Sequence, residues 1–243
     1  VTLNEAVIVD TSAGTPRIAV TLDSGGIVYA DYLSGSGTTA LTFRLPVSAD
    51  QLDTDGVSLN NSIDANGGTL RDAAGNTALL TLNNVGNTSS VQIDAVAPIV
   101  TSVTVPADGN YVAGQHLNFT VNLSEAVTLD TSNGTPRLAL DLGGTTVYAS
   151  YVSGSGSNAL VFTYIVNTGE GDSSSISLPD NISLNGATIR DAAGNNTVTT
   201  LHNSAATNNV LIDATAPTAA SLTLTDTSAA QNLSYTLVLS EAV

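Results

Sequence analysis

The residues of this chain that could do chemistry are acidic side chains that occur twice, at matching places in two similar stretches of sequence. Calcium binds about 6–8 oxygen atoms from carboxylates, side-chain amides and backbone carbonyls, and a DAAGN loop offers a carboxylate, an amide and a glycine at which the chain can turn. We therefore predict structural Ca²⁺ sites. Their candidate ligands come from the motifs EAV, DAAGN and IDAxAP: Glu5 and Glu125, Asp72 and Asp191 with Asn76 and Asn195, and Asp94 and Asp213.

The same aspartates have a simpler explanation, in which each one caps a turn by accepting hydrogen bonds from nearby backbone N–H groups. We favour calcium, because several carboxylates recur with few arginines nearby to neutralise them. Asp94 and Asp213 lie on predicted linkers, where a bound ion would draw ligands from two modules and stiffen the joint.

A second acidic patch, DQLDTDG at 50–56, contains Asp53 and Asp55. It ends in D-x-D-G, but it matches the calcium loop of EF-hands poorly, and the second stretch has EGD at 170–172 instead. We interpret it as a solvated acidic loop, with metal binding as the less favoured alternative.

The motif DTSxGTPR, at 10–17 and 130–137, is the most faithfully repeated one. It lacks the spacing of a phosphate-binding loop, so we interpret it as structural. Its proline fixes φ and its glycine allows a turn. Its arginine, Arg17 or Arg137, is expected to pair with a nearby carboxylate.

An enzymatic function is not predicted, and neither are catalytic residues or an organic cofactor. The two histidines, His116 and His202, have no histidine counterpart in the matching stretches, and the chain contains neither a cysteine nor an HExxH zinc motif. A Ser-His-Asp site needs a histidine positioned in a pocket, whereas both histidines are explained as polar surface residues.

The charge of the chain restricts its partners. Its 243 residues include 21 Asp and Glu against 5 arginines and no lysine, for a formal net charge of −16. Phosphate binding needs clustered basic residues, so nucleic acid and anionic membranes are disfavoured as partners. No apolar run approaches the roughly 18 residues of a membrane-spanning helix. Without an initiator methionine or a signal peptide, the chain is expected to be an internal piece or a processed product.

Internal repetition decides the predicted architecture. Residues 1–20 and 121–140 are identical at 13 of 20 positions, and DAAGN and IDAxAP recur further on. The repeat period is about 119 residues, which suits an independently folding domain. We predict an immunoglobulin-like module at 1–96 that lacks its first strands, a complete module at 97–215, and the first strands of a third module at 216–243.

Each module is predicted to be all-β, because apolar and polar residues alternate with a period of two. The alternation is clearest over 117–123 and again over 233–239. Together with the turn signals it favours a β-sandwich of about seven strands. Other predicted strands are 136–142, 146–152, 159–166, 187–190 and 209–213, and a surface turn is expected at 106–114.

The shifted frame of the repeats leaves two possibilities open. The sequence is a window of a long array cut without regard to module edges, or residues 216–243 of one molecule complete residues 1–96 of the next. The second possibility gives a head-to-tail filament through β-strand addition.

The motifs SEAV, GTPRLAL, YxxYVSGSG, DAAGN and VxIDxTAP together resemble the tandem immunoglobulin-like repeats of very large bacterial surface proteins, such as the stalks of secreted adhesins and biofilm proteins. The resemblance implies an extracellular location at the cell surface, calcium at module junctions, and neighbouring modules as partners. It places those calcium ligands among Glu125, Asp191 and Asp213 and their partners in the first stretch.

The predicted function is therefore an adhesive, calcium-rigidified extender. A self-assembling filament subunit is the first alternative. The second is a carbohydrate-binding accessory module, which would need an exposed aromatic platform. The regularly placed tyrosines at 29, 32, 148 and 151 lie in predicted strands, where packing is expected instead.

Overall fold

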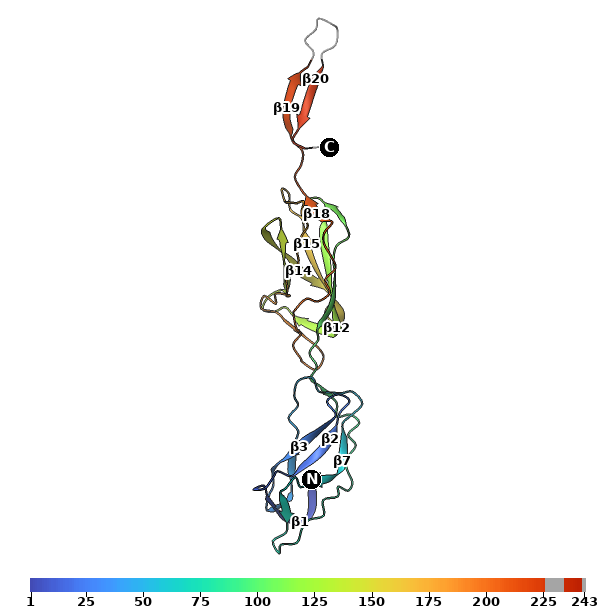
Figure 1. Cartoon of the computed structure of the whole chain (residues 1–243), viewed down its shortest axis with the longest axis vertical. Helices are drawn as coiled ribbons and strands as arrows, with labels where there is room; N and C mark the ends of the chain where they lie inside the picture. Colours follow the sequence, from blue (N-terminus) through green and yellow to red (C-terminus); the bar gives the residue numbers. More distant parts are fainter. Residues whose placement is uncertain (226–233, 242–243) are drawn as a thin grey trace. The chain divides into compact units, whose positions relative to one another are not determined.

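The computed structural model describes residues 1–225 and 234–241, and this part of the chain contains strands, turns and irregular segments but no helix (Figure 1). The fold is therefore all-β, as predicted. The chain divides into two compact units. Unit 1 comprises residues 1–97 with 193–195, and unit 2 comprises residues 98–192 with 196–243. The segments 226–233 and 242–243 of the predicted third module, including Leu233, lie outside the described residues.

Unit 2 is built around a sheet in the order β10-β12-β15-β14-β13, and β17 pairs with the far end of β12. Most of these strands lie within two residues of the predicted ranges, but β12 runs on beyond 123. Their bounds are β10 Val100–Thr104, β12 His116–Asp130, β13 Arg137–Leu142, β14 Thr145–Ser153, β15 Ser157–Ile165 and β17 Thr188–Arg190.

Strand β12 serves two sets of partners. Its first part pairs with β10 and β15, and its last three residues pair with β17. The register with β15 shifts between Asn122 and Val127. The strand thus changes partners within the EAV motif.

A small sheet of three strands completes unit 2. β11 (Gly109–Tyr111) runs parallel to β18 (Val210–Asp213), and β16 (Gly171–Asp172) pairs with the other edge of β18. The expectation of a surface turn over 106–114 was wrong in its centre, because backbone pairing with β18 makes residues 109–111 a strand. Single-sequence periodicity cannot detect so short a strand.

The core of unit 2 follows the predicted alternation. Leu117, Phe119, Val121 and Leu123 on β12 are buried, whereas Asn118 between them is exposed. Side chains that alternate in this way place one face of the strand in the core. The other elements contribute buried apolar residues to the same continuous cluster, among them Val103, Leu138, Leu140, Leu160 and Phe162.

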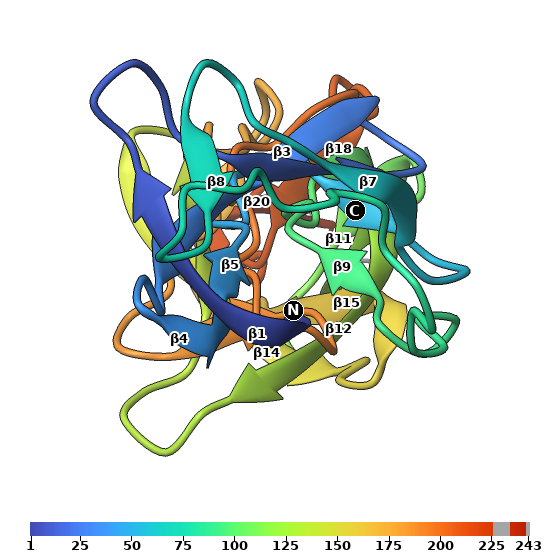
Figure 2. The same cartoon turned by 90° about the horizontal axis from the view of Figure 1, so that it is seen from below.

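Unit 1 contains three sheets, in the orders β4-β1-β8, β5-β3-β2-β7 and β6-β9. Figure 2 labels several of their strands, among them β1, β4 and β8. The first sheet consists of β1 (Thr2–Asp10), β4 (Thr38–Ala40) and β8 (Thr69–Arg71). The second consists of β2 (Arg17–Thr21), β3 (Ile27–Ser34), β5 (Thr42–Arg44) and β7 (Ser58–Asp64). The third consists of β6 (Leu52–Asp53) and β9 (Ile93–Asp94).

The apolar core of unit 1 is divided into two clusters. One gathers around Val7 and Leu41, and the other gathers around Val20 and Leu22. Unit 2 instead has one cluster that runs through the whole unit. The two clusters of unit 1 together contain fewer buried apolar residues than the single cluster of unit 2, and burial of apolar residues is the main source of folding free energy.

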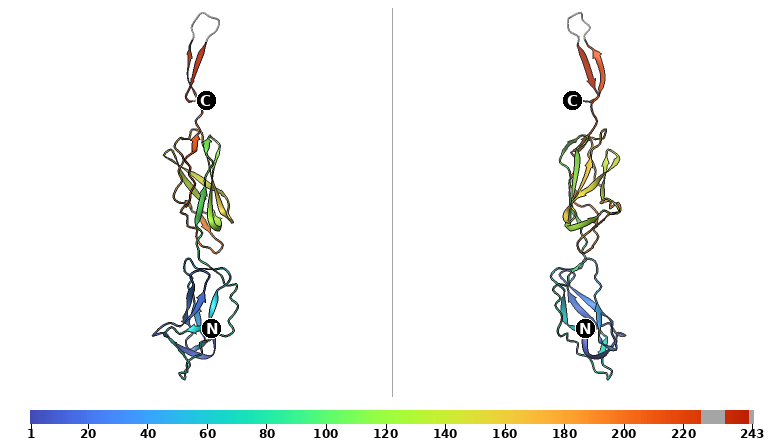
Figure 3. Two further views of the ribbon diagram at one scale, coloured as in Figure 1. Left: turned by 45° about the vertical axis from the view of Figure 1, so that its right-hand side comes forward. Right: turned by 180° about the vertical axis from the view of Figure 1, so that it is seen from behind.

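A hairpin follows the small sheet of unit 2 along the chain. Its strands, β19 (Ala219–Leu224) and β20 (Tyr235–Leu239), pair antiparallel, and each pairs only with the other in the described part of the chain (Figure 3). Large apolar side chains on both strands are exposed, including Leu222 and Leu237. An isolated two-stranded hairpin is marginally stable at best in water.

Candidate metal centre

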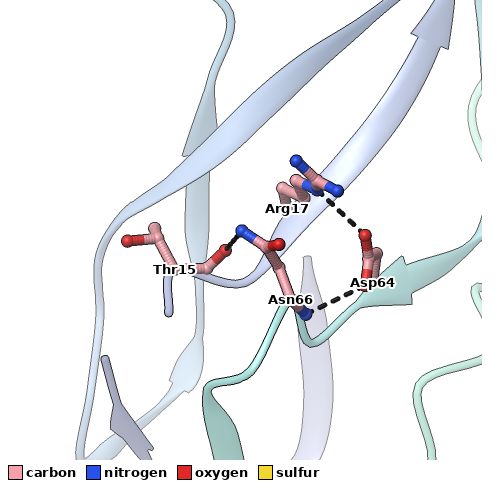
Figure 4. A network of polar contacts seen from close by, with 4 residues as sticks. All are labelled: Thr15, Arg17, Asp64 and Asn66. Atoms are coloured by element: carbon pink, nitrogen blue, oxygen red, sulfur yellow. Dashed lines mark hydrogen bonds and ion pairs between the residues drawn. The ribbon is translucent and has the colours of Figure 1, made fainter. Parts of the chain in front are cut away.

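The motif DTSxGTPR forms the corner that leads from β1 to β2. A Cβ atom on Gly14 would lie 1.8 Å from the carbonyl oxygen of Asn66, so only glycine permits this approach. The side-chain amide of Asn66 in turn donates a hydrogen bond of 3.1 Å to the carbonyl oxygen of Thr15 (Figure 4). The matching Gly134 lies equally close to Asn185. The motif therefore fixes the backbone of this corner through close packing and a hydrogen bond, in line with the structural interpretation.

The arginine of this motif behaves differently in the two units. Arg17 Nε lies 2.9 Å from Asp64 Oδ2, which confirms the predicted ion pair (Figure 4). For Arg137 the prediction was wrong, because its Nε is buried without a hydrogen-bond partner. Its guanidinium stacks on Tyr148, 3.9 Å from the ring centroid, as that of Arg17 stacks on Tyr29 at 3.8 Å. Ser183 pairs with Arg137 where unit 1 has Asp64.

The structure brings together two of the predicted ligands in unit 2. One carboxylate oxygen of Glu125 and one of Asp191 lie within 4.8 Å of each other. Glu125 is half-buried on β12, where that strand changes partners, and Asp191 directly follows β17 and is only 6% exposed. Because β17 pairs with β12 from Thr128 onward, this pairing carries the two acids to the same place.

The DAAGN loop of unit 1 is closed by its own aspartate. Asp72 Oδ1 accepts a hydrogen bond of 2.8 Å from the backbone N–H of Asn76, and Oδ2 accepts one of 2.7 Å from the Asn76 side-chain amide. The side-chain and backbone hydrogen bonds from Asn76 lower the pKa of Asp72 below its usual value. The hydrogen bonds thus favour the ionised form of Asp72 and direct its carboxylate toward its own loop. This is the arrangement that the turn-cap explanation predicts.

Unit 1 also places the predicted ligands of its own motifs around one pocket. Glu5, Asp72 and Asn76 line a pocket of about 190 Å³, together with residues of β1 and of the segment that follows the DAAGN loop. Glu5 on β1 thus approaches the loop after β8 in unit 1, as Glu125 on β12 approaches Asp191 in unit 2.

The remaining predicted ligands occupy turns. Asp94 ends β9, and its Oδ1 accepts a hydrogen bond of 3.2 Å from Val96 N. Asp213 ends β18, and its Oδ1 accepts one of 3.4 Å from Thr215 N. Asn195, which groups with unit 1, donates from Nδ2 to the carbonyl oxygen of Asp94 at 3.1 Å. Asp213 belongs to no group of three neighbouring acids in the described part of the chain.

The second acidic patch of the sequence gains a member in unit 1, Asp23, that the sequence reasoning missed. Asp23, Asp53 and Asp55 have carboxylate oxygens within 4.8 Å of one another. The interpretation of 50–56 as solvated was wrong for Asp53, which is only 3% exposed, because β6 pairs with β9 and holds it inside. Asp23 lies in the turn between β2 and β3, and the matching turn of unit 2 has glycine there, so a search for repeated acids could not find it.

The counterpart of Asp53 in unit 2 is Asp172, which is buried as well. It accepts hydrogen bonds from Gly143 N at 2.9 Å, from Ser174 N at 2.8 Å and from Ser174 Oγ at 2.7 Å. Burial acts to raise the pKa of Asp172, but the hydrogen bonds from Ser174 and Gly143 outweigh it and lower the pKa. Asp172 thus accepts three hydrogen bonds from N–H and O–H donors, whereas Asp53 in unit 1 accepts one, from Gly56 N at 2.8 Å, and lies beside two other carboxylates.

The regularly placed tyrosines pack as expected at two of four positions. Tyr32 meets Phe43 edge-on, and Tyr151 meets Phe162 in the same way, with ring centroids 6.0 Å apart in both pairs. Tyr29 and Tyr148 are exposed in part, but an arginine covers the ring face of each.

The acids of the two units must be interpreted from their geometry and from the motifs that carry them. The described residues include no helix long and apolar enough to cross a membrane. No family model, no curated protein and no solved structure matches the chain.

Proposed function

We propose that the chain is a structural segment of an adhesive bacterial surface protein. It forms part of an extracellular row of immunoglobulin-like β-sandwich modules, with a period of about 119 residues, that extends other parts of the protein away from the cell. Calcium is its structural ion, and no catalytic role is assigned to it. The all-β architecture and the surface-repeat motifs support this proposal.

The observation that carries the calcium proposal is the pairing of Glu125 with the buried Asp191 in unit 2. Two like charges this close repel by on the order of 3 kcal/mol at an effective dielectric constant near 20. Asp191 is only 6% exposed, so water screens this repulsion poorly. A divalent cation offsets the repulsion, and carboxylate oxygens are the ligands that Ca²⁺ prefers.

The matching acids in unit 1 strengthen the proposal. Glu5, Asp72 and Asn76 face one pocket, so the EAV and DAAGN motifs meet in both units. Asp94 and Asp213 remain proposed ligands, although each accepts a hydrogen bond from a nearby backbone N–H group. Backbone carbonyls and water would supply the remaining oxygens of the coordination sphere.

The test is calcium titration by calorimetry, combined with thermal unfolding in calcium and in chelator. A ligand that binds only the folded state raises the unfolding free energy by RT ln(1 + [L]/Kd), about 2.7 kcal/mol at 100 times Kd. We expect the double variant Glu125→Gln/Asp191→Asn to lose heat of binding and the calcium-dependent rise in Tm.

The matched control is Asp180→Asn, which removes one negative charge from an exposed position of the same unit and should leave calcium binding unchanged. Equal melting of the native chain in calcium and in chelator, without heat on titration, would exclude the proposed metal site.

A further inference from the structure

The outer face of the main sheet of unit 2 carries an arginine that no carboxylate of a described residue neutralises. On β13, Leu138 and Leu140 are buried, so the side chain of Arg137 points to the opposite face of the sheet. Its guanidinium lies over the exposed ring of Tyr148 on β14. The Arg137 side chain forms no ion pair or hydrogen bond with a described residue, and its Nε is enclosed. This face therefore presents a positive charge that lacks a partner.

A row of paired residues crosses the sheet at Arg137. Backbone pairing places Ser183 on one side of Arg137 and Ser150 on the other. The row continues from Ser150 to Thr163 and from Thr163 to Asn118. Every neighbour in the row carries a hydroxyl or an amide group, so Arg137 alone is charged among these five residues.

The matching row of unit 1 alternates in charge. Asp64 and Asp31 lie on either side of Arg17. Asp31 also pairs with Arg44 on the next strand. Asp64 Oδ2 lies 2.9 Å from Arg17 Nε (Figure 4). The row of unit 1 thus contains two acids for two arginines and is neutral as a whole.

The two rows differ in their charges but not in how they hold the first arginine. Unit 2 has serine at both positions where unit 1 has an acid, and threonine where unit 1 has Arg44. The guanidinium lies over a tyrosine ring in both units, 3.8 Å from the centroid of Tyr29 in unit 1 and 3.9 Å from that of Tyr148 in unit 2. Unit 2 therefore positions the guanidinium as unit 1 does, but without the carboxylates.

A carboxylate is the ligand that suits this guanidinium. Arginine presents its N–H donors in a planar fork that matches the two oxygens of a carboxylate, and Asp64 occupies such a position in unit 1. Because the Nε of Arg137 is enclosed, an incoming carboxylate meets the edge formed by the two Nη atoms. Asp141, on the same strand, accepts a hydrogen bond from Gly144 N at 2.9 Å and does not pair with Arg137.

The surroundings of Arg137 favour a carboxylate that belongs to a sugar. The hydroxyl group of the exposed Ser150 can both donate and accept hydrogen bonds. The Thr163 hydroxyl donates to Asn118 Oδ1 at 2.7 Å, so its oxygen is left to accept. Apolar side chains flank the row on the same strands, since Val152 is 62% and Ile165 is 50% exposed. Hydroxyl groups next to apolar side chains suit the hydroxyls and the C–H faces of a sugar ring.

An acidic peptide is a poorer match for this surface. Extended peptides are recognised by pairing with a free strand edge. The outer edge of β13 is already bonded, because Arg137 N donates to the carbonyl oxygen of Ser183 at 2.9 Å and Asp141 N donates to that of Ser177 at 3.1 Å. The ligand must therefore be recognised through side chains on the sheet face.

We propose that unit 2 binds an acidic polysaccharide on this face, with the carboxylate of a uronic acid on the Nη edge of Arg137. Hydroxyl groups of the sugar contact Ser150 and Thr163, and a ring face packs against Ile165. Unit 1 does not bind the polysaccharide, because Asp64 neutralises Arg17 and repels a second carboxylate. The proposal gives unit 2 a binding role beyond the structural one, and it requires no calcium.

The test is an NMR titration of the full chain with oligogalacturonate, a chain of uronic acids, in the presence of chelator. We expect saturable shifts of the resonances of Arg137, Ser150 and Ile165. The fully methyl-esterified oligomer has the same sugars without the charge. Its dissociation constant should be at least about tenfold higher, because hydrogen bonds to charged groups are the stronger ones. Equal binding of the two oligomers overturns the proposal.

Two variants of unit 2 and a matched variant of unit 1 locate the site. Arg137→Gln should raise the dissociation constant at least about tenfold. Ser183→Asp should do the same, because it gives Arg137 the internal carboxylate that Asp64 gives Arg17, and its amide spectrum shows directly whether unit 2 stays folded. Arg17→Gln is the control and should bind like the native chain. Native-like binding by a folded Ser183→Asp variant overturns the proposal, and so does an equal loss in Arg17→Gln.

Two further measurements separate the polysaccharide from other sources of a carboxylate. Polyglutamate that binds at Arg137 as tightly as oligogalacturonate would assign the site to peptides. Self-association that Arg137→Gln abolishes, measured by sedimentation velocity without sugar, would assign it to a second copy of the chain. Either result overturns the proposal. Because every titration is made in chelator, its outcome is independent of the calcium sites.

Discussion

Units 1 and 2 share their motifs but not their cores. In unit 2, β10 and the first part of β12 contribute buried residues to one continuous apolar cluster, whereas the buried apolar residues of unit 1 form two separate clusters. Gly14 and Gly134 nevertheless approach an asparagine carbonyl oxygen in the same way in both units. The comparison teaches that the repeated motifs fix the same corners and local register in two units whose cores differ.

The largest expected effect on the free energy of unfolding comes from truncating the two phenylalanines that meet a tyrosine edge-on. Phe162→Ala should lower the free energy of unfolding of unit 2 by about 3–5 kcal/mol, because Phe162 is fully buried and its removal leaves a cavity. Phe43→Ala in unit 1 should cost less, about 1–2 kcal/mol, since Phe43 is only half-buried. Denaturant unfolding, followed separately for each unit, measures both. Equal losses would show that the core of unit 1 is as closed as that of unit 2.

An intermediate effect is expected at the buried aspartates. Asp172→Asn should lower the unfolding free energy of unit 2 by about 1–2 kcal/mol at pH 7, because hydrogen bonds from Ser174 and Gly143 favour the ionised form. The pKa of Asp172 is lowered in the folded chain, so this stabilisation is present above the unfolded pKa of about 3.9 and disappears as the pH falls through the folded value.

The matched substitution Asp53→Asn should instead raise the unfolding free energy, that of unit 1, in metal-free buffer. It removes one of three carboxylates that lie within 4.8 Å of one another, and relief of like-charge repulsion raises stability. Thermal unfolding of both variants at pH 7 and below pH ~4 tests the contrast. A loss of stability on Asp53→Asn would mean that the hydrogen bond from Gly56 N to the Asp53 carboxylate outweighs the repulsion among the three acids.

The smallest effect is expected at the two arginines. Arg17→Gln removes a solvent-exposed ion pair with Asp64 and should lower the unfolding free energy only slightly. High salt should reduce that cost, because it screens exposed charges. Arg17→Gln also removes stacking on Tyr29, and Arg137→Gln removes the matching stacking on Tyr148 without an ion pair in the described part of the chain. The cost of Arg137→Gln should therefore depend less on salt. Chemical unfolding at low and high salt measures the difference between the two.

Much of the fold follows from the sequence because the alternation of apolar and polar residues along a strand predicts which of its faces is buried. Leu117, Phe119, Val121 and Leu123 are examples in which periodicity alone identified the core face. The short strand β11 escaped prediction because it exists only through pairing with β18, about a hundred residues later in the chain. Local sequence carries no signal of such a partner.

The acidic sites, too, could be predicted from the sequence only in part. Repetition pointed to Glu125 and Asp191, and strand pairing between β12 and β17 does bring them together. Repetition could not point to Asp23, which has no acidic counterpart in unit 2, nor to the burial of Asp53 beside it. That group depends on how the turn after β2 meets β6, a property of tertiary packing in one unit alone.

Strand β12 has a mechanical consequence. Its first part is bonded to β10 and β15, its last residues are bonded to β17, and Glu125 lies at the change of partners. A pulling load that slides β12 past β17 must therefore also change the distance between Glu125 and Asp191. A ligand that bridged these two acids would resist that shear, so the charge of this corner and the tensile strength of the strand would depend on the same few residues.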